Sequence, residues 1–216
     1  MEDASPVKSQ RVPPTAVARL PLYLRCLQEA QQMGQQILSS KELAELAGGN
    51  AAQVRKDLSY LGEFGIRGIG YEVESLIRHI SRWLGLTRKH NVAIVGMGRL
   101  GSALLGYPGF SEKGFEVAAA FDSDPAKVGG KIDGVVVDDI ASLPARVREK
   151  EIEIAIVATP ASAAQRVGDM LADAGIRAIL NFAPVHLEVP DDVNCRQVDL
   201  SVELQILCFH LERQRE

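Results

Sequence analysis

Three glycines and one aspartate carry the strongest chemical signal in the sequence. Gly96, Gly98 and Gly101 follow an apolar run in the spacing G-x-G-x-x-G, within NVAIVGMGRLGS. The first glycine of such a turn permits a tight bend, the second lets a pyrophosphate approach the backbone, and the third allows close packing of helix on strand. Asp122 ends the next apolar run, 21 residues after Gly101 (122 minus 101), where a carboxylate binds ribose hydroxyls. The pattern predicts a dinucleotide site, and the acid favours NAD(H) because it would repel the 2′-phosphate of NADP(H).

The residues after this motif predict the parallel sheet that such a site requires. Apolar runs of strand length alternate with helical patterns, from GVVVDD through IEIAIVATP to IRAILNFAP. This alternation is typical of a doubly wound α/β domain of the Rossmann type, in which ligands bind beyond the carboxyl ends of the strands. Thr159, Pro160, Asn181 and Phe182 follow two of these runs, so we expect them to face the cofactor.

Residues for catalysis on such a cofactor are scarce. Hydride transfer needs a substrate pocket and usually an acid–base group. The sequence has no Tyr-x-x-x-Lys pair, and of its four histidines only His186 falls at the mouth of the sheet, where a surface role is equally compatible. The 35 residues after Asn181 (216 minus 181) are too few for a catalytic domain. We predict no catalytic residues and no metal site.

The first ninety residues carry a different pattern. Residues 19–32, RLPLYLRCLQEAQQ, predict a helix with Pro21 near its first turn, where a missing N–H costs least. Ser39 and Glu42 form a capping box for a second, short helix, and Asn50 caps a third, AAQVRKDLSYLG. Helix, glycine-containing turn and helix is the outline of a helix-turn-helix.

The last of these helices has a face suited to DNA. At about 100° per residue, Val54, Leu58 and Leu61 fall on one side. The rest of its surface carries hydrogen-bond donors, a small residue and an aromatic, namely Ala52, Gln53, Arg55, Lys56, Ser59 and Tyr60. Such donors reach phosphates and base edges in the major groove, and a small residue allows close approach. An ordinary solvated helix face is the alternative interpretation.

A glycine-rich segment, GEFGIRGIGY, follows this helix directly. Short apolar pieces separated by glycines predict a small hairpin with Arg67 and Gly68 near its tip. A hairpin after a recognition helix is a wing, and an arginine there suits the narrow, negative minor groove. The alternative is a flexible linker between domains. One more amphipathic helix, YEVESLIRHISRWLGL, is expected before the linker at Thr87–His90.

Composition sets wider limits. Residues 1–90 hold 12 Lys+Arg and 9 Asp+Glu, net +3, whereas residues 91–216 hold 12 and 19, net −7, which together give the net charge of −4. A mildly basic front weakly favours a polyanionic partner. No apolar run reaches the roughly 18 residues of a membrane span, and the polar N-terminus has no signal-peptide pattern. The three scattered cysteines, Cys26, Cys195 and Cys208, indicate reduced thiols in a cytoplasmic protein.

The C-terminal segment predicts a helix that needs a partner. In residues 201–214, SVELQILCFHLERQ, Leu204, Leu207, Cys208 and Leu211 share one apolar face, and Ser201 can cap the start. A helix of this kind must bury its apolar face, and it can do so by folding back on its own subunit.

Taken together, these motifs resemble the Rex family of bacterial redox-sensing transcriptional repressors. The likeness covers about residues 12–210 and includes QVRKDLSYLGEFGIRGIGY, IVGMGRLGSAL with YPGF behind it, FDSDPAKVG and ILNFAPVHLEVP. It implies an N-terminal winged helix-turn-helix domain, a doubly wound Rossmann domain and a homodimer that exchanges its C-terminal helices. It also implies operator DNA binding that is released when NADH rises relative to NAD⁺. The expected domains are a disordered tail (1–11), a winged-helix domain (12–87), an NAD(H)-binding domain (88–200) and a dimerisation helix (201–216).

The resemblance extends to individual residues. The predicted cofactor contacts are Gly96, Met97, Gly98, Arg99, Leu100, Gly101, Tyr107, Asp122, Lys127, Thr159, Pro160, Asn181 and Phe182. The predicted DNA contacts are Gln53, Arg55, Lys56, Ser59, Tyr60, Arg67 and Gly68. Arg25 and Asp199 are expected to form a state-dependent pair between the domains. The sequence departs from the family at Leu200, where members often carry an aromatic residue that would screen the nicotinamide ring.

Two rival hypotheses remain from the sequence. One is a small NAD-dependent oxidoreductase whose front domain binds protein. The other is a coenzyme A-binding module, which shares this sheet topology, although Asp122 would repel the adenosine 3′-phosphate. DNA binding distinguishes the repressor from both.

Overall fold

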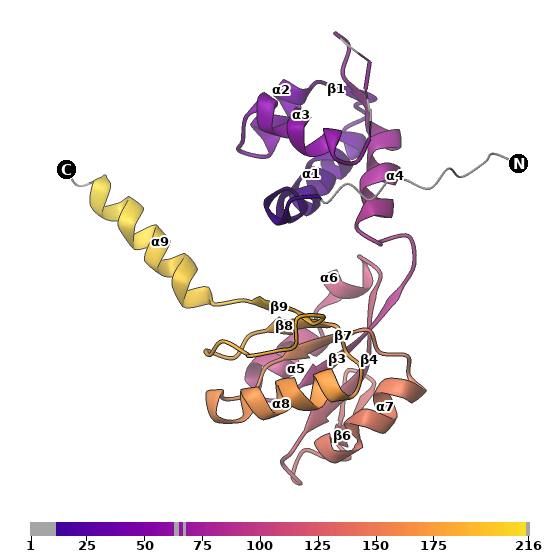
Figure 1. Cartoon of the computed structure of the whole chain (residues 1–216), viewed down its shortest axis with the longest axis vertical. Coiled ribbons are helices and arrows are strands. Elements are labelled where there is room, and N and C mark those ends of the chain that lie inside the picture. Colours follow the sequence, from indigo (N-terminus) through magenta and orange to yellow (C-terminus); the bar gives the residue numbers. More distant parts are fainter. Residues whose placement is uncertain (1–11, 63–64, 67, 215–216) are drawn as a thin grey trace, which may run out of the picture. The chain divides into compact units, whose positions relative to one another are not determined.

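The computed structural model describes residues 12–62, 65–66 and 68–214. The chain divides into two compact units between Arg88 and Lys89. Figure 1 colours them along the sequence, from indigo and magenta in the N-terminal unit to orange and yellow at the C-terminus. Each unit has its own hydrophobic core.

The N-terminal unit begins with α1 (Pro14–Gln32), which is longer than expected. Pro14 occupies the first turn, so the predicted position of Pro21 near the start is wrong and Pro21 lies inside the helix. A proline there removes the hydrogen bond to the carbonyl of Val17. Both residues are exposed, so the proline ring faces away from the core.

The helix-turn-helix forms as the capping residues predict. In α2 (Ser40–Leu46), Ser39 accepts from the Glu42 N–H and Glu42 accepts from the Ser39 N–H, which is a complete capping box. In α3 (Ala51–Ser59), Asn50 accepts from the Gln53 N–H at 2.8 Å. These side chains satisfy N–H groups that a helix start otherwise leaves unpaired.

A small antiparallel pair and a last helix complete this unit. Strand β1 (Ile37–Leu38) pairs with β2 (Tyr71–Glu72), and α4 (Val73–Trp83) follows. Before β2, an antiparallel bridge joins Ile66 to Gly70, which encloses the turn of the predicted wing. The large fully buried side chains of this unit come from all four helices and β1: Leu27, Leu38, Leu43, Leu58, Leu76 and Ile80.

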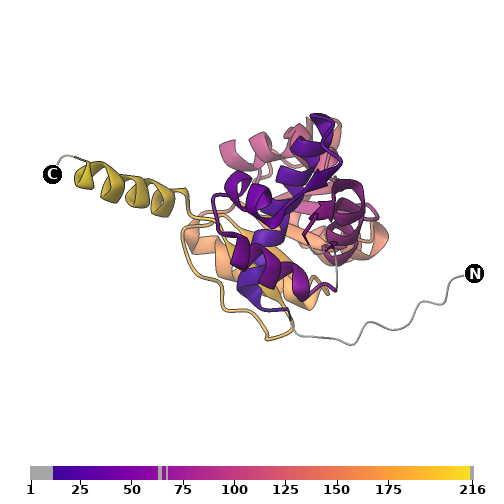
Figure 2. The same ribbon diagram turned by 90° about the horizontal axis from the view of Figure 1, so that it is seen from above.

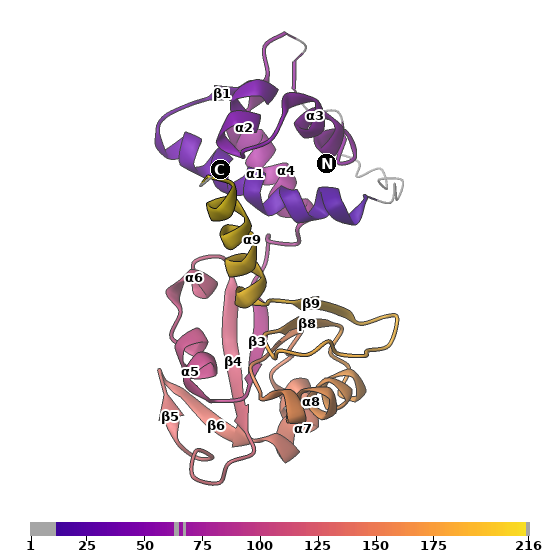
Figure 3. The ribbon, with the colours of Figure 1, turned by 90° about the vertical axis from the view of Figure 1, so that its left-hand side faces the viewer.

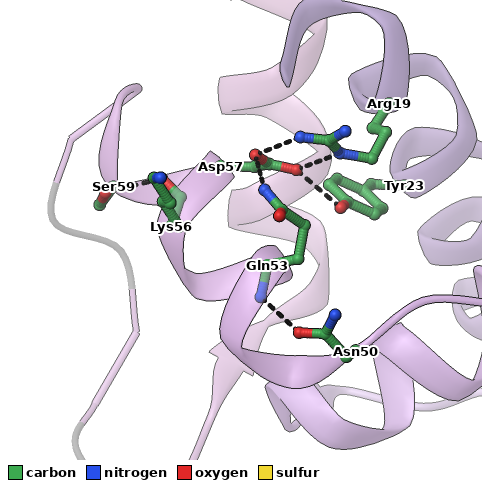
Figure 4. Close-up of polar contacts among 7 residues, drawn as sticks. All are labelled: Arg19, Tyr23, Asn50, Gln53, Lys56, Asp57 and Ser59. Atoms are coloured by element: carbon green, nitrogen blue, oxygen red, sulfur yellow. Dashed lines mark hydrogen bonds and ion pairs between the residues drawn. The ribbon is translucent and has the colours of Figure 1, made fainter. Parts of the chain in front are cut away.

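One buried carboxylate ties α3 to α1 (Figure 4). Asp57 is fully buried, and its two oxygens accept four hydrogen bonds. Arg19 donates twice, at 2.6 and 2.8 Å, while Tyr23 Oη and Gln53 Nε2 each donate at 2.8 Å. Burial alone would raise the pKa of Asp57, but these donors hold it below its ordinary value. Burial and the bond to Asp57 also raise the pKa of Tyr23 to about 12.

The C-terminal unit is a doubly wound sheet in the order β5-β6-β4-β3-β7-β8-β9, parallel except for β5. Its strands are β3 (His90–Val95), β4 (Phe115–Asp122), β5 (Lys131–Ile132), β6 (Val135–Asp139), β7 (Ile154–Val157), β8 (Ala178–Asn181) and β9 (Asn194–Gln197). Its helices are α5 (Arg99–Leu105), α6 (Pro108–Ser111), the 3₁₀ turn η1 (Ile140–Ser142), α7 (Leu143–Glu149), α8 (Ala161–Asp173) and α9 (Leu200–Arg213).

Helices cover both faces of this sheet. Figure 3 shows α5 and α6 on one side of β3 and β4, and α7 and α8 on the other. Along β3, Ala93 and Val95 belong to the core under α7 and α8, whereas Val92 and Ile94 belong to the core under α5. Alternate side chains of a strand point to opposite faces, so a strand covered on both sides is apolar throughout.

Two C-terminal features differ from expectation. Strand β9 was not predicted, because its residues NCRQ are mostly exposed and show no apolar alternation. Helix α9 starts at Leu200, and its cap is Asp199, not Ser201: the Asp199 carboxylate accepts from the Ser201 N–H and hydroxyl. No residue of α9 is buried, and Figures 1 and 2 show it leading away from the sheet of its own unit.

The Asp57 network gives a testable pH dependence. A depressed carboxyl pKa adds stability above its ordinary value near 3.8, and that stability is lost as the pH falls through the folded-state pKa. We expect Asp57→Ala to lower the unfolding free energy by about 3 kcal/mol at neutral pH. This is the lower end of the range for breaking a buried ion pair, because 34% of the Arg19 side chain is exposed and solvent screens its charge.

Denaturant unfolding at several pH values measures this effect. The difference between wild type and Asp57→Ala should shrink as the pH falls below 4. Glu45→Ala is the matched control, because its exposed carboxylate lies 3.9 Å from Lys41 and should contribute less than about 0.5 kcal/mol. Equal effects of the two substitutions would contradict the account.

Candidate functional site

A cleft of about 690 Å³ opens where the strand order of the sheet reverses. The chain proceeds from β3 to one side of the sheet through β4 and β6, and returns to β7 on the other side of β3. Such a reversal leaves a crevice at the carboxyl ends of the two central strands. The lining includes Gly96, Gly98, Arg99, Leu100, Asp122, Asp124, Lys127, Ile140, Ala158, Thr159, Pro160, Arg166, Met170 and Phe182.

Two of the three motif glycines are required by the fold itself. Gly96 has φ +98°, and a Cβ there would lie 2.7 Å from the carbonyl oxygen of Ala158. A Cβ on Gly101 would lie 1.9 Å from the carbonyl oxygen of Gly96, because α5 packs directly on the end of β3. Larger residues at either position must displace backbone.

The third glycine has no such requirement. Gly98 has an ordinary φ of −80°, and a Cβ there would meet nothing within 4 Å. The open space beside Gly98 is part of the cleft, at the start of α5. A glycine that the protein alone does not need fits a site where a pyrophosphate must come close to the backbone.

Asp122 lines this cleft and has 8% of its surface exposed. Its Oδ2 accepts from the Met97 N–H at 2.8 Å and from Lys127 Nζ at 2.9 Å, and its Oδ1 accepts from the Asp124 N–H. Burial would raise the pKa of this carboxyl, but the donors hold it below its ordinary value. A carboxylate offers about four acceptor positions, so Asp122 can still accept from a ribose hydroxyl while it holds the glycine loop.

One polar atom in the cleft is left without a protein partner. The hydroxyl oxygen of Thr159 is buried, and no described residue forms a hydrogen bond with it. Buried hydroxyls normally have a partner, so an unpaired one on the cleft wall fits a ligand. The residues present therefore fit a dinucleotide, with Thr159, Gly98 and Asp122 spread along the cleft.

Several predicted cofactor residues lie elsewhere. Met97 contributes its backbone N–H to Asp122, but its side chain is buried in the core under α5. Asn181 is fully buried and donates to Val185 and Gln197, so it braces the end of β8. Tyr107 is 55% exposed and packs edge-on against a neighbouring ring, outside the cleft lining. For these side chains the structure gives no support for contact with a ligand in the cleft.

The sequence interpretation missed one cation of the cleft. Arg166 lies on α8 and lines the cleft with Arg99 and Lys127. Lys127 is paired with Asp122, whereas the guanidinium groups of Arg99 and Arg166 suit a ligand with a pyrophosphate. Because α8 follows β7 directly, the first turns of α8 must lie near the carboxyl ends of the central strands. The sequence position of Arg166 could therefore have predicted that it lines the cleft.

The exposed face of α3 agrees with the angular prediction. Val54 and Leu58 are buried, whereas Arg55, Lys56 and Ser59 are exposed. Arg55 donates to the hydroxyl of Ser40, and the Ser59 hydroxyl donates to the carbonyl of Lys56. The Lys56 ammonium has no partner among the residues that the structure describes, and remains available for an anion.

The remaining predicted contacts are less defined. Tyr60 is half-buried at the end of α3, and Gly68 lies in the wing turn with φ +84°. Arg67 lies outside the described residues. A groove of about 760 Å³ runs between α3 and the wing, lined by Arg55, Ser59, Gly62, Ile66, Gly68 and Ile69 among others.

The two predicted switch residues belong to different units. Arg25 is exposed on α1, where its guanidinium lies 3.9 Å from Glu29. Asp199 caps α9. Their pairing stays a prediction. Over the described ranges, no cluster of three or more His, Cys, Asp or Glu residues is arranged to hold a metal, and no helix has the length and apolarity of a membrane span.

Comparisons with known proteins match both units. Residues 11–59 match the family model described as "Putative DNA-binding protein N-terminus", and residues 87–185 match the "CoA binding domain". The redox-sensing transcriptional repressor Rex of Streptomyces avermitilis is 51% identical over 206 residues, which is 95% of this chain and 82% of that protein. Rex of Chloroflexus aurantiacus is 49% identical over 209 residues, 97% of this chain and 99% of that protein.

Solved structures give the same result. The crystal structure of RSP, a Rex-family repressor, superimposes with a TM-score of 0.89 at 37% identity and covers 96% of this chain and 97% of that one. RSP in complex with beta-NAD⁺ and operator DNA gives 0.89 at 38% identity, over 96% of this chain and 95% of that one. RSP in complex with beta-NADH gives 0.87 at 36% identity, with 96% and 97% covered.

The fold and the two sites define a class of protein: a winged helix-turn-helix domain joined to a dinucleotide-type α/β domain, as in a ligand-responsive DNA-binding regulator. The predicted fold class of these two domains is confirmed. The chain belongs to the Rex family of redox-sensing transcriptional repressors.

Gly98 and Gly101 form a matched pair for testing the cleft. Gly98→Ala should leave the unfolding free energy within about 0.5 kcal/mol of wild type, because its Cβ enters open space. It should nevertheless weaken NADH binding by about tenfold or more, since the methyl group occupies the space of the pyrophosphate. Gly101→Ala should cost about 3 kcal/mol of stability by forcing α5 off β3.

Denaturant unfolding and NADH titration by fluorescence separate these effects. If Gly98→Ala binds NADH with the affinity of the wild type, the pyrophosphate does not bind beside Gly98.

Proposed function

We propose that this protein is a transcriptional repressor that binds operator DNA through its winged helix and releases it when NADH occupies the Rossmann cleft. The observation that carries the proposal is the match to RSP over 96% of this chain, across both domains, in complexes with operator DNA and with either nucleotide. In this chain, the open space at Gly98 suits the nucleotide, and the exposed hydrogen-bond donors of α3 suit the DNA.

The dinucleotide acts here as a signal. When bound, the nicotinamide ring exists in two redox states whose charge and shape differ. Asp122 and Lys127 would bind the adenosine ribose. The pyrophosphate would lie against the backbone of Gly98 and near the side chains of Arg99 and Arg166. A ligand shifts the equilibrium between two protein conformations only by the difference between its affinities for them. NADH and NAD⁺ must therefore differ in this affinity difference.

An oxidoreductase is the second candidate, and the cleft does not favour it. Among the described residues that line it there is no histidine, tyrosine or cysteine. Lys127 is hydrogen-bonded to Asp122 and is therefore poorly placed to move a proton. Coenzyme A is disfavoured by the Asp122 carboxylate, although Lys127 offsets part of its repulsion of a phosphate.

We propose a homodimer held by exchange of α9. Seven large apolar side chains of this helix are exposed: Leu200, Val202, Leu204, Ile206, Leu207, Phe209 and Leu211. A helix that is apolar on most of its surface is normally buried in an assembly. A two-fold dimer would present two α3 helices to half-sites about one helical turn, or a multiple of it, apart. A chain ending at Asp199 that sediments as a dimer would refute this arrangement.

The remaining assignments follow from the same proposal. Residues 12–87 form the DNA-binding domain and residues 88–200 the nucleotide-binding domain, with Arg67 and Gly68 of the wing at the minor groove. Arg25 and Asp199 form the switch between them. A regulator of this kind acts in the cytoplasm, where chromosomal DNA and NADH are both present, and it carries out no reaction on the nucleotide.

Titration of a fluorescent duplex, first selected with the full-length chain, tests the function. NADH should weaken DNA binding by about 5- to 150-fold, the usual range of an allosteric coupling of 1–3 kcal/mol, whereas NAD⁺ should not. The Gly98→Ala variant should bind DNA normally and need an NADH concentration about tenfold higher or more for the same release. DNA affinity that is indifferent to both nucleotides would contradict the proposal.

A further inference from the structure

Gln53 occupies a position from which a recognition helix reads bases. It is the third residue of α3, after the cap Asn50 and two alanines. In helix-turn-helix proteins the N-terminal residues of the second helix contact base edges in the major groove. Gln53 is half-buried, and its side-chain nitrogen donates to Asp57 at 2.8 Å (Figure 4).

The side-chain amide of Gln53 can face Asp57 in only one sense. An ionised carboxylate accepts hydrogen bonds and donates none, so it selects the NH₂ end of the amide. Asp57 is kept ionised by the two bonds from Arg19 and the bond from Tyr23. The oxygen of the amide, Oε1, is consequently turned away from the carboxylate, and no described residue donates a hydrogen bond to it.

We propose that Asp57 is a positioning residue that fixes the amide of Gln53 with its oxygen as the free acceptor, so that α3 selects a base with an exocyclic amino donor in the major groove. This inference rests on the proposed DNA-binding function. Adenine offers its N6 amino group and cytosine its N4 amino group, whereas guanine and thymine present only acceptors to the major groove at the corresponding place. Gln53 is therefore expected to favour adenine or cytosine at one position in each half-site.

The opposing interpretation makes Gln53 part of the packing between α3 and α1. In that case Gln53→Ala would change stability and overall affinity, but not the choice of base at any one position. Base preference is therefore the readout that separates a reading role from a structural one.

Selection of binding sites from a randomised duplex library, with the full-length wild type and Gln53→Ala, makes this comparison. Gln53→Ala leaves the Arg19, Tyr23 and Asp57 bonds in place, so the domain should fold. We expect a preference for adenine or cytosine to disappear at one position per half-site and to persist at the others. Lys56→Ala, on the same helix, should lower affinity for all sequences alike, because a phosphate contact carries no base preference.

A base analogue tests the hydrogen bond itself. Replacing the selected adenine by purine, or the selected cytosine by 2-pyrimidinone, removes only the amino group. Wild type should lose about 2- to 10-fold in affinity, the range of one hydrogen bond, and Gln53→Ala should lose nothing.

Asp57→Asn should weaken the preference. Arg19 donates to both oxygens of Asp57, so the NH₂ group of the new residue removes one acceptor in either orientation, and the negative charge that selects the NH₂ end of Gln53 is lost. The discrimination in favour of adenine or cytosine should fall at the same position and at no other. Tyr23→Phe is the matched control, because it removes one bond to Asp57 without touching Gln53, and its base preference should equal that of wild type.

The outcomes distinguish the inference from the function on which it rests. A wild type that enriches no sequence would overturn both. An enriched operator whose base preferences are identical for wild type and Gln53→Ala, with equal losses on the analogue, would overturn the role of Gln53 alone. Should Asp57→Asn fail to fold, the Gln53→Ala and analogue measurements still decide.

Discussion

The hydrogen bonds that converge on Asp57 are the interaction on which the DNA-binding domain depends. Helix α3 has nine residues and is too short to be stable alone. Only Val54, Asp57 and Leu58 within it are buried, so few apolar contacts hold it, and its other side must stay free for a ligand. Burying a carboxylate costs several kcal/mol, which four hydrogen bonds from Arg19, Tyr23 and Gln53 offset. Hydrogen bonds are directional, so these bonds fix the rotation of α3 about its own axis relative to α1. Apolar packing alone restricts this rotation less strictly.

The nucleotide-binding domain uses the same physical solution. Asp122 is buried at the end of β4 and joins the glycine loop, through the Met97 N–H, to Lys127 on the following turn. The loop is thus held in place by contacts within the protein, and the donors around Asp122 keep the pKa of its carboxyl below the ordinary value. Gly98 contributes the complementary feature, space that the protein does not fill. In both domains a buried carboxylate positions the segment that we propose as the ligand-binding one.

Much of this architecture could be predicted from the sequence, because its signals are local. The capping residues Ser39 and Asn50, the glycine spacing and Asp122 all act within a few residues of their own positions or at a fixed distance along one motif. The start of α1 was misjudged because two prolines compete for the role of first residue. Asp57 escaped notice because its partners Arg19 and Tyr23 are 38 and 34 residues away, and only the fold brings them together. The position of Asn181 at the end of a strand predicts a cofactor contact, but in the structure its side chain donates to Gln197 of β9. Strand β9 has no apolar pattern, so the sequence gives no sign of this partner.

The central claim is that one chain couples two ligands that bind to different domains. Such coupling is a free energy shared by both equilibria, so it can be measured from either side. The most direct measurement is calorimetric titration of NADH into the full-length protein, once alone and once saturated with its selected operator duplex. The account predicts that operator DNA weakens NADH binding by the same factor by which NADH weakens DNA binding. An NADH affinity that is identical with and without DNA would contradict it.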